Sequence, residues 1–377
     1  IVPLAQPGMI AKGLRWMLRS DSPFYVKPRL SWDLARWGML FWKHATEAHV
    51  QYAIPVLRDL SWLSKKLFQE LAESQLFDFG WHERGLFMLY KTETAEHEMA
   101  EEAALANRAG VEAQMLSAKE VQAYEPHVQV DVRGAVYYPG DAHLNPSLLI
   151  KNLTSYLRQK DVRIYENQKV IGFEKKGKTI SKLKTESIGF KTQNPNPQTS
   201  TFDIEHLVLA AGAWSPLLTD KLGISLPLQG GKGYSFMIEQ VPHNIQIPAI
   251  MLEARATATP MGADLRFAGT LEVAGTDLSV NMNRVRGIVE GVRKFYPDIE
   301  VKLPTVDKVW RGLRPCSPDG LPYIGRTSKF NNLTLATGHG MMGISLGPAT
   351  GKLVSEIIGE QKTSVNIEPF RPSRFYT

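Results

Sequence analysis

Residues 310–351 decide the fold of this 377-residue chain. They begin W-R-G-L-R-P-C-S-P-D-G-L-P-Y-I-G-R and end N-L-T-L-A-T followed by G-H-G-M-M-G-I-S-L-G-P-A-T-G. The apolar run 333–336 predicts a short buried strand, and the pattern becomes helical from Ile344. Glycines at such a junction let the backbone approach a ligand, and a helix start offers free N–H groups and a positive dipole end. The stretch therefore predicts a ligand-binding turn.

Arg314 is the first candidate for a ligand contact, because it stands beside a turn rich in Pro, Asp and Gly at 315–320. A guanidinium held near the glycine turn suits a substrate carboxylate, since its fork binds both carboxylate oxygens at once. A structural ion pair, for example with Asp319, is the alternative. We expect His339, inside the turn, to act as a positioning or hydrogen-bonding residue rather than as an acid or base.

Composition bounds the protein class. A hydrophobic content of 43% and a charged content of 22% are ordinary for a globular protein of one large or two smaller domains. There is no run of about 18 apolar residues that predicts a spanning helix, and the first ten residues lack the features of a secretory signal. The single Cys316 excludes an internal disulfide and favours a reducing compartment, which predicts a cytoplasmic protein.

Periodicity and turn residues predict a mixed chain. Helices are expected over residues 9–19, 31–46, 47–74, 94–108, 117–124, 147–158, 216–222 and 281–295. Strands are expected over residues 77–81, 85–90, 134–139, 161–166, 169–173, 207–211, 228–239, 250–257 and 265–272. Pro55 predicts a kink or break in the longest helix, and residues 192–200 predict an exposed loop. Strands concentrated in the middle and alternation elsewhere predict an α/β fold with an α+β substrate domain, one part on a parallel and one on an antiparallel sheet.

The helix expected over residues 31–46 is unusually aromatic and basic. The residues that give it this character are Trp32, Arg36, Trp37, Phe41, Trp42 and Lys43. Core packing and a face that lies on a bilayer both explain this pattern. The net charge of +6 is mild and spread out, so a membrane surface or an anionic substrate is compatible with it, whereas a nucleic-acid partner is not expected.

A second strand–glycine–helix junction occurs at L-V-L-A-A-G-A-W-S-P, residues 207–216. Combined with G-L-R-P-C-S-P-D-G-L-P-Y-I-G-R, G-H-G-M-M-G and G-D-A-H-L-N-P (140–146), it makes the chain resemble the FAD-dependent amine and amino-acid oxidoreductases. This family includes glycine oxidase and the D-amino-acid dehydrogenases. The opening P-L-A-Q-P-G-M-I-A-K-G-L-R-W-M-L is most similar to bacterial D-amino-acid dehydrogenases, including D-hydroxyproline dehydrogenases.

The resemblance implies FAD as cofactor and two interleaved domains. A Rossmann-like FAD-binding domain would comprise residues 1–78, 140–226 and 308–377, and an antiparallel-sheet substrate-binding domain residues 79–139 and 227–307. The family begins with a βαβ unit carrying G-x-G-x-x-G, and no such unit opens this chain, whose Gly8 stands in a Pro-Gly turn. We therefore expect a fragment without its first βαβ unit that binds FAD poorly or not at all when made alone; the alternative is a chain that never bound FAD.

The resemblance also implies roles for individual residues. Arg314 would bind the substrate carboxylate, and the backbone of Val170 would contact the adenine. The cofactor-binding residues implied are Val170, Ala210, Ala211, Gly212, Trp214, Gly338, His339, Gly340, Met341 and Gly343. The further candidates for the substrate pocket are His143, Tyr234, Arg255, Arg266, Met341 and Met342. Asn145 is a candidate helix cap, and Thr257 stands near the position where glycine oxidase-like relatives carry a tyrosine.

The implied reaction is oxidative deamination of a D-amino acid. Hydride would pass from the α carbon to flavin N5, and the imine would hydrolyse to a 2-oxo acid. A quinone or another respiratory carrier would take the electrons, so peripheral contact with the inner face of the cytoplasmic membrane is compatible with this reaction. The alternatives are an oxygen-using amine or glycine oxidase, a dehydrogenase of a hydroxy compound on the same fold, and a non-enzymatic remnant without flavin. No Cys/His/carboxylate spacing predicts a metal site.

Overall fold

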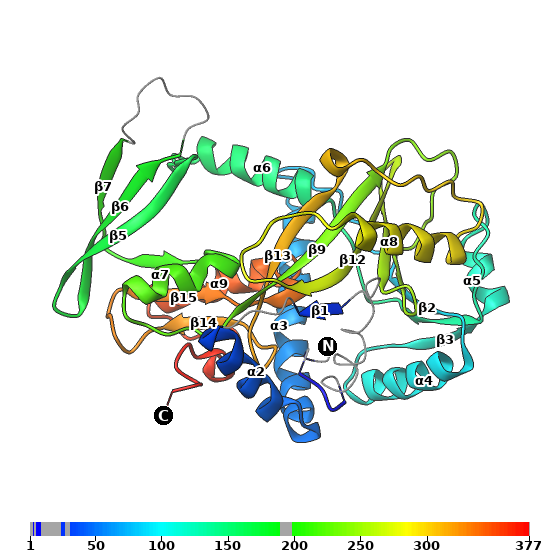
Figure 1. Cartoon of the computed structure of the whole chain (residues 1–377), viewed down its shortest axis with the longest axis horizontal. Helices are drawn as coiled ribbons and strands as arrows, with labels where there is room; N and C mark the ends of the chain where they lie inside the picture. Colours follow the sequence, from blue (N-terminus) through cyan, green and yellow to red (C-terminus); the bar gives the residue numbers. More distant parts are fainter. Residues whose placement is uncertain (1–2, 4, 9–23, 27–30, 189–197, 377) are drawn as a thin grey trace.

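The computed structural model describes residue 3 and residues 5–8, 24–26, 31–188 and 198–376 (Figure 1). The helix expected over 9–19 and most of the loop expected over 192–200 lie outside these ranges. The described chain is a mixed α/β protein in which a large sheet lies on one side and two small sheets on the other (Figure 1). The mixture of helices with parallel and antiparallel strands confirms the predicted fold class.

The large sheet contains nine of the described strands, in the order β13-β9-β12-β11-β10-β2-β4-β3, with β1 pairing in parallel with β12. Their bounds are β1 (Phe24–Val26), β2 (Leu86–Tyr90), β3 (Gln114–Ser117), β4 (Gly134–Tyr138), β9 (Gln229–Ile238), β10 (Ala249–Met251), β11 (Ala256–Met261), β12 (Asp264–Val273) and β13 (Trp310–Cys316). Strands β13, β9, β12 and β11 are antiparallel neighbours. They form the part of the sheet that carries most of the candidate substrate residues.

The two faces of this antiparallel part differ because side chains alternate along each strand. One face is apolar and buried beneath helix α8 (Met282–Phe295). Its core includes Tyr234, Phe236, Ala256, Ala258, Leu265, Phe267, Val285, Ile288 and Val292. The opposite face carries half-buried residues at the alternate positions, such as Thr257, Arg266 and Ala268. It is less completely covered than the face beneath α8, and we call it the open face.

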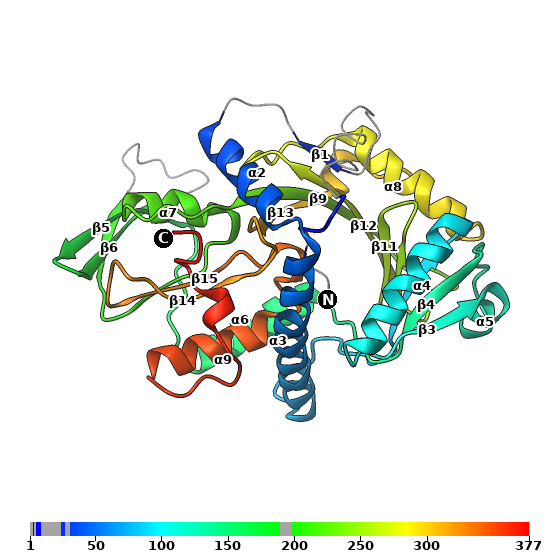
Figure 2. The same cartoon turned by 90° about the horizontal axis from the view of Figure 1, so that it is seen from below.

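The smaller sheets and their helices form the other region. Strands β14 (Tyr323–Arg326), β15 (Leu333–Thr337) and β8 (Leu207–Leu209) make one sheet, in which β15 and β8 are parallel. Strands β5 (Gln168–Lys176), β6 (Thr179–Ser187) and β7 (Thr199–Asp203) make the other. Helix α3 (Glu47–Glu73) runs between the two regions and packs against α9 (Gly347–Ile358) through a core that includes Leu60, Ile324 and Leu353 (Figure 2).

Capping residues start several of the remaining helices. Ser31 caps α2 (Trp32–His44), Thr92 caps α4 (Glu93–Arg108), and Asn145 caps α6 (Pro146–Gln159). Ser117 and Glu120 form a complete capping box at α5 (Ala118–Tyr124). The other described helical elements are α7 (Ser215–Lys221) and the 3-10 turns η1 (Gly212–Trp214), η2 (Val306–Lys308), η3 (Gly340–Met342) and η4 (Glu368–Phe370). No helix within the described ranges is long and apolar enough to cross a membrane.

Three strand predictions were wrong in detail. Residues 77–81 form no strand, because Gly80 adopts a positive φ, the rings of Phe79 and Trp81 pack against Phe68, and the ring of Phe77 packs against Phe79. Residues 161–166 also form no strand, and the run 250–257 is split into β10 and β11. The predicted break at Pro55 does not occur, since α3 continues through it. The domain bounds stay a prediction; β13, from the segment 308–377, joins the large sheet.

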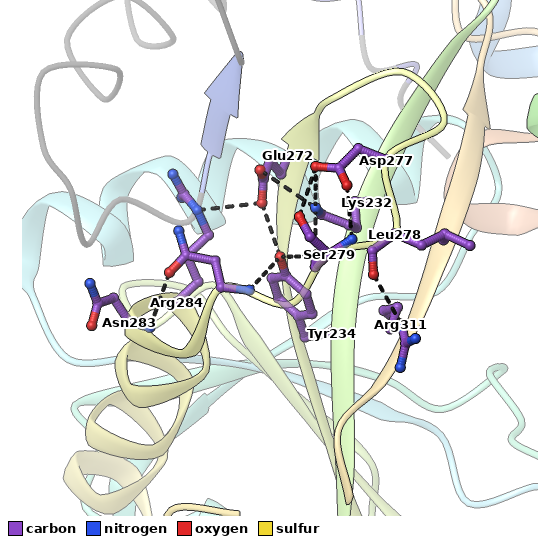
Figure 3. Close-up of polar contacts among 10 residues, drawn as sticks. Lys232, Tyr234, Glu272, Asp277, Leu278, Ser279, Asn283, Arg284 and Arg311 are labelled. Atoms are coloured by element: carbon purple, nitrogen blue, oxygen red, sulfur yellow. Dashed lines mark hydrogen bonds and ion pairs between the residues drawn. The ribbon is translucent and has the colours of Figure 1, made fainter. Parts of the chain in front are cut away.

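A buried polar network stands on the face of the large sheet that α8 covers (Figure 3). Lys232, only 1% exposed, lies 3.7 Å from Glu272 and 3.4 Å from Asp277. Arg284 of α8 approaches Glu272 at 3.6 Å, and the Tyr234 hydroxyl donates to the same carboxylate at 3.0 Å. Two cations therefore face two carboxylates, and the network is close to neutral.

Replacing Glu272 should destabilise the protein strongly. Glu272→Ala leaves Lys232 and Arg284 buried beside a single, more exposed acid, so we expect a loss of about 3–5 kcal/mol in the free energy of unfolding. Urea unfolding followed by circular dichroism measures it. Glu300→Ala, at an exposed ion pair with Lys302, is the control and should change stability by less than about 0.5 kcal/mol. Equal effects of the two variants would contradict the account.

Candidate functional site

The two glycine turns predicted from the sequence lie beside each other. Strands β8 and β15 are parallel neighbours, so their carboxyl ends meet at one edge of the sheet. The buried Thr337 hydroxyl donates to the Gly212 carbonyl at 3.1 Å, and the Ser215 hydroxyl donates to Thr337 at 3.0 Å. These bonds join the turn after β8 to the turn after β15 and make one site of them.

Both turns are open to a ligand. Gly338, Gly340 and Gly212 have φ values of 82°, 55° and 55°, which L side chains rarely adopt. A Cβ added at Gly340 or Gly212 would meet no atom within 4 Å, so free space lies in front of the backbone. Helix α9 then starts at Leu346 without a side-chain cap. Leu346 is the N-cap of the helix, and the first amides are used within the chain, since Gly347 donates to the Ile344 carbonyl and Ala349 donates to the Ser64 hydroxyl.

Apolar side chains around the turns are exposed to an unusual degree. Met341 is 65% exposed, Met342, Ile344 and Trp214 are each about two-fifths exposed, and Val208 of β8 is similarly open. Exposed apolar side chains beside a glycine turn favour a ligand-binding site. A flat apolar ring system beside glycine backbone would cover it, so these residues fit the ring end of FAD.

His339 is held as a neutral ring. Its Nε2 lies 2.9 Å from the Thr350 hydroxyl, which itself donates to the Leu346 carbonyl at 2.8 Å. The hydroxyl proton is used there, so Nε2 carries the hydrogen and donates to Thr350. Burial lowers the pKa of His339 from 6.5 to about 4. This geometry supports the expectation that His339 positions the turn rather than exchanging protons.

Strand β13 connects the turns to the large sheet. Cys316, at its end, forms an antiparallel bridge with His339, and the Trp37 indole of α2 donates to the Cys316 carbonyl at 2.9 Å. The Cys316 thiol is buried, which raises its pKa to about 11. A thiol of that pKa stays protonated and is a poor nucleophile at neutral pH. Cys316 is therefore a structural residue.

Arg314 stands two residues before Cys316 and projects onto the open face of the large sheet. Its guanidinium lies across Gly233 of β9, where a Cβ would overlap the guanidinium carbon and nitrogens. Its Nη1 donates to the Thr270 carbonyl at 2.8 Å. The alternative ion pair with Asp319 does not form, because Arg374 binds both Asp319 oxygens at 2.7 and 2.9 Å. Arg314 is thus oriented by backbone and carries no carboxylate partner among the described residues.

Thr270 supports Arg314 through a strained backbone. It lies in the irregularity of β12 between Gly269 and Glu272 and has a φ of 64°, which a β-branched residue avoids. Its hydroxyl is buried with no hydrogen-bond partner in the part of the chain that the structure describes. Strain of this kind persists where surrounding structure imposes it. Here it aims the Thr270 carbonyl at the guanidinium.

The structure brings only some of the other candidates to this face. Arg266 lies there and donates from Nη2 to the Ser235 hydroxyl at 3.3 Å. Thr257 pairs with Ala268 on the same face. Met341 and Met342 lie in η3, which contacts β13. These residues and Arg314 make up the candidate pocket.

Other candidates lie elsewhere. Tyr234 is fully buried on the opposite face, in the network with Glu272. Arg255 stands at the turn before β11. Burial lowers its pKa there, and the charge of Glu98 in α4 acts in the opposite direction. His143 pairs through its backbone with His82, and burial together with His82 lowers its pKa to about 4. Val170 lies in β5, which packs against α7.

The sequence interpretation missed four residues that build the site. Gly231 and Gly233 leave one face of β9 bare, and their spacing of two within a strand was a readable signal for Gly233. Thr337 gave no signal, because a threonine at the end of a strand is common and its sequence context does not show what its hydroxyl binds. The bulge at Thr270 has no local signature, because only the pairing with β9 shows it.

Known proteins are similar to this chain over most of its length. The model of the DAO family, described as FAD dependent oxidoreductase, matches residues 8–357. A D-amino acid dehydrogenase of Granulibacter bethesdensis is 29% identical over 97% of this chain and 85% of its own length, and one of Helicobacter pylori is 27% identical over 99% and 86%. The crystal structure of glycine oxidase from Geobacillus kaustophilus is 27% identical, with a TM-score of 0.71 over 85% of this chain and 82% of that one. The chain belongs to the DAO family of FAD-dependent oxidoreductases.

Proposed function

We propose that this oxidoreductase is a D-amino-acid dehydrogenase. The observation that carries the proposal is the Arg314 guanidinium, which lies across Gly233 with no acidic partner and only two residues from the bridge between Cys316 and His339. A carboxylate bound there is held beside the exposed glycine turn. The names of the relatives in Granulibacter bethesdensis and Helicobacter pylori support the choice of a D-amino acid.

The two joined turns would hold the cofactor. The proposed cofactor-binding residues are Val170, Ala210, Ala211, Gly212, Trp214, Gly338, His339, Gly340, Met341 and Gly343. FAD supplies the oxidant of the reaction, taking up the α-hydrogen and its electron pair from the amino acid. Backbone N–H groups at such turns stabilise negative charge without reorganising.

The protein contributes mainly orientation. Arg314 can give a carboxylate a bidentate pair of hydrogen bonds, while the Thr270 carbonyl occupies Nη1 from the other side. A fixed carboxylate fixes the α carbon, and orientation of this kind supplies much of the rate of such a reaction. With a pKa of about 4, His339 is too weak a base to take a proton from the substrate ammonium group, so the amine must arrive unprotonated. The imine then hydrolyses in water to the 2-oxo acid and ammonia.

The electron acceptor is proposed from the surface of α2. Trp37 is buried, but Trp32 and Trp42 are 76% and 69% exposed, and Met39 lies between them on the same side with Lys43. Aromatic side chains with cations on one helix face favour contact with a membrane surface. We therefore place a quinone-type respiratory acceptor, with peripheral attachment of a cytoplasmic protein, ahead of oxygen.

Anaerobic addition of D-alanine, D-proline and D-hydroxyproline to the full-length protein, loaded with FAD, tests the proposed function. We expect at least one of them to bleach the visible flavin band. If none does so, while a hydroxy acid or glycerol 3-phosphate does, the amino-acid proposal is refuted. A subsequent comparison of reoxidation by a short-chain quinone with reoxidation by oxygen tests the acceptor.

Arg314→Met should reduce kcat/KM for flavin reduction by about 10³-fold, because it removes a charged bidentate partner of the substrate. Stopped-flow absorbance measures the rate. Arg311→Met is the control, since Arg311 is exposed on the other face of β13 and donates to the Leu278 carbonyl. A loss below tenfold in Arg314→Met would remove this arginine from the site.

Gly233→Ala should displace Arg314 without removing its charge. The added methyl group would occupy the position of the guanidinium, and a displacement of about 1 Å costs on the order of 10² in rate. Gly38→Ala adds the same group in α2, where no atom lies within 4 Å, and should leave kcat/KM unchanged. Equal kcat/KM values in the two variants would contradict the proposed orientation of Arg314.

The pH dependence of kcat/KM should follow the pKa of the substrate amine. Burial lowers the pKa of His339 to about 4, so the ring stays neutral between pH 5 and pH 9 and adds no inflection there. We expect the acid limb of kcat/KM to move to lower pH with D-serine, whose amine is less basic than that of D-alanine. An inflection between pH 5 and pH 7 that disappears in His339→Asn would show that the imidazole takes part in proton transfer.

A further inference from the structure

Two guanidinium groups share the open face of the large sheet. Arg314 lies across Gly233, and Arg266 reaches Ser235. Gly233 and Ser235 are two residues apart on the same face of β9, which places the two groups about 7 Å apart along the strand. They come from strands on opposite sides of β9, so they converge on it from both directions.

The described acidic residues near this face have other partners. Asp264, the nearest one along β12, accepts from the Gln240 backbone at 3.0 Å at the end of the hairpin. Asp319 is taken by Arg374. Glu272 and Asp277 belong to the network on the opposite face, with Lys232 and Arg284 (Figure 3). Within the described ranges, neither Arg314 nor Arg266 forms an ion pair with any of them.

The two faces therefore differ in charge balance. On the covered face Lys232 and Arg284 meet two carboxylates, as buried cations usually do. On the open face both arginines are partly desolvated, and burial lowers the pKa of each. Arg266 lowers the pKa of Arg314 further, as a like charge does. Two neighbouring cations with reduced hydration constitute a site for two negative charges.

We infer that the substrate carries a second carboxylate, as D-aspartate and D-glutamate do, with Arg314 binding the α-carboxylate and Arg266 the side-chain carboxylate. This inference rests on the proposed function and names its substrate class. The short aliphatic spacer of these amino acids suits two guanidinium groups that converge on neighbouring positions of one strand. The Ser235 hydroxyl, which accepts from Arg266, holds that side chain in place.

Flavin reduction by D-glutamate and D-aspartate, compared with D-norvaline and D-glutamine, tests the inference in the FAD-loaded protein. We expect kcat/KM for the better acidic substrate to exceed that for D-norvaline by at least about 10²-fold, because an apolar side chain leaves Arg266 unpaired. Arg266→Met should lower this ratio by about 10²-fold. Arg311→Met should leave the ratio unchanged. A ratio near one in the unaltered protein would overturn the inference.

Equilibrium binding separates failure of the inference from failure of the proposed function. Isothermal titration of the same protein with glutarate and with valerate compares two carboxylates with one, and we expect glutarate to bind at least tenfold more tightly, with the difference lost in Arg266→Met. If D-norvaline reduces the flavin and glutarate has no advantage, the inference fails and the proposed function stands. If no amino acid reduces the flavin but glutarate binds through Arg266, the dicarboxylate site stands and the proposed reaction fails.

Discussion

The Arg314 guanidinium lies against β9 at Gly233, where any Cβ would overlap it. The candidate site depends on this contact. The bulge at Thr270 turns a carbonyl toward the guanidinium. Two residues after Arg314, β13 ends at Cys316, which forms the bridge with His339. One short strand therefore links the proposed carboxylate-binding group on the large sheet to the glycine turns of the smaller one. The relative position of these two parts determines where a bound α carbon lies.

The two faces of the large sheet differ in packing and in charge. Under α8, apolar side chains and a nearly neutral polar network fill the core, and Glu272 offsets Lys232 and Arg284 there. The opposite face is half-buried, holds arginines without acidic partners among the described residues, and adjoins exposed methionines of η3. Alternation along β9 produces the division, since Gly233 and Ser235 point one way and Lys232 and Tyr234 the other. A one-residue change of register would exchange the two roles.

Local patterns were sufficient to predict much of the fold and part of the site. The capping box at Ser117, the helix start at Asn145 and both strand–glycine–helix junctions depend on neighbouring residues, so the sequence shows them directly. The sequence alone could not show which face of the sheet Tyr234 occupies, because that depends on how β9 pairs with β12 and β13. The run 77–81 looked like a strand because aromatic residues favour both strands and clusters, and tertiary packing against Phe68 decided between them.

The central claim is that Arg314 recognises the α-carboxylate of an amino acid beside the flavin-binding turn. Comparing D-alanine with D-alaninamide as reductants of the FAD-loaded protein tests it most directly, since the amide keeps the α carbon and amine but removes the negative charge. The account predicts that kcat/KM for anaerobic flavin reduction falls by about 10³-fold with the amide. Equal rates with both compounds would show that carboxylate recognition is not what positions the substrate, and would contradict the account.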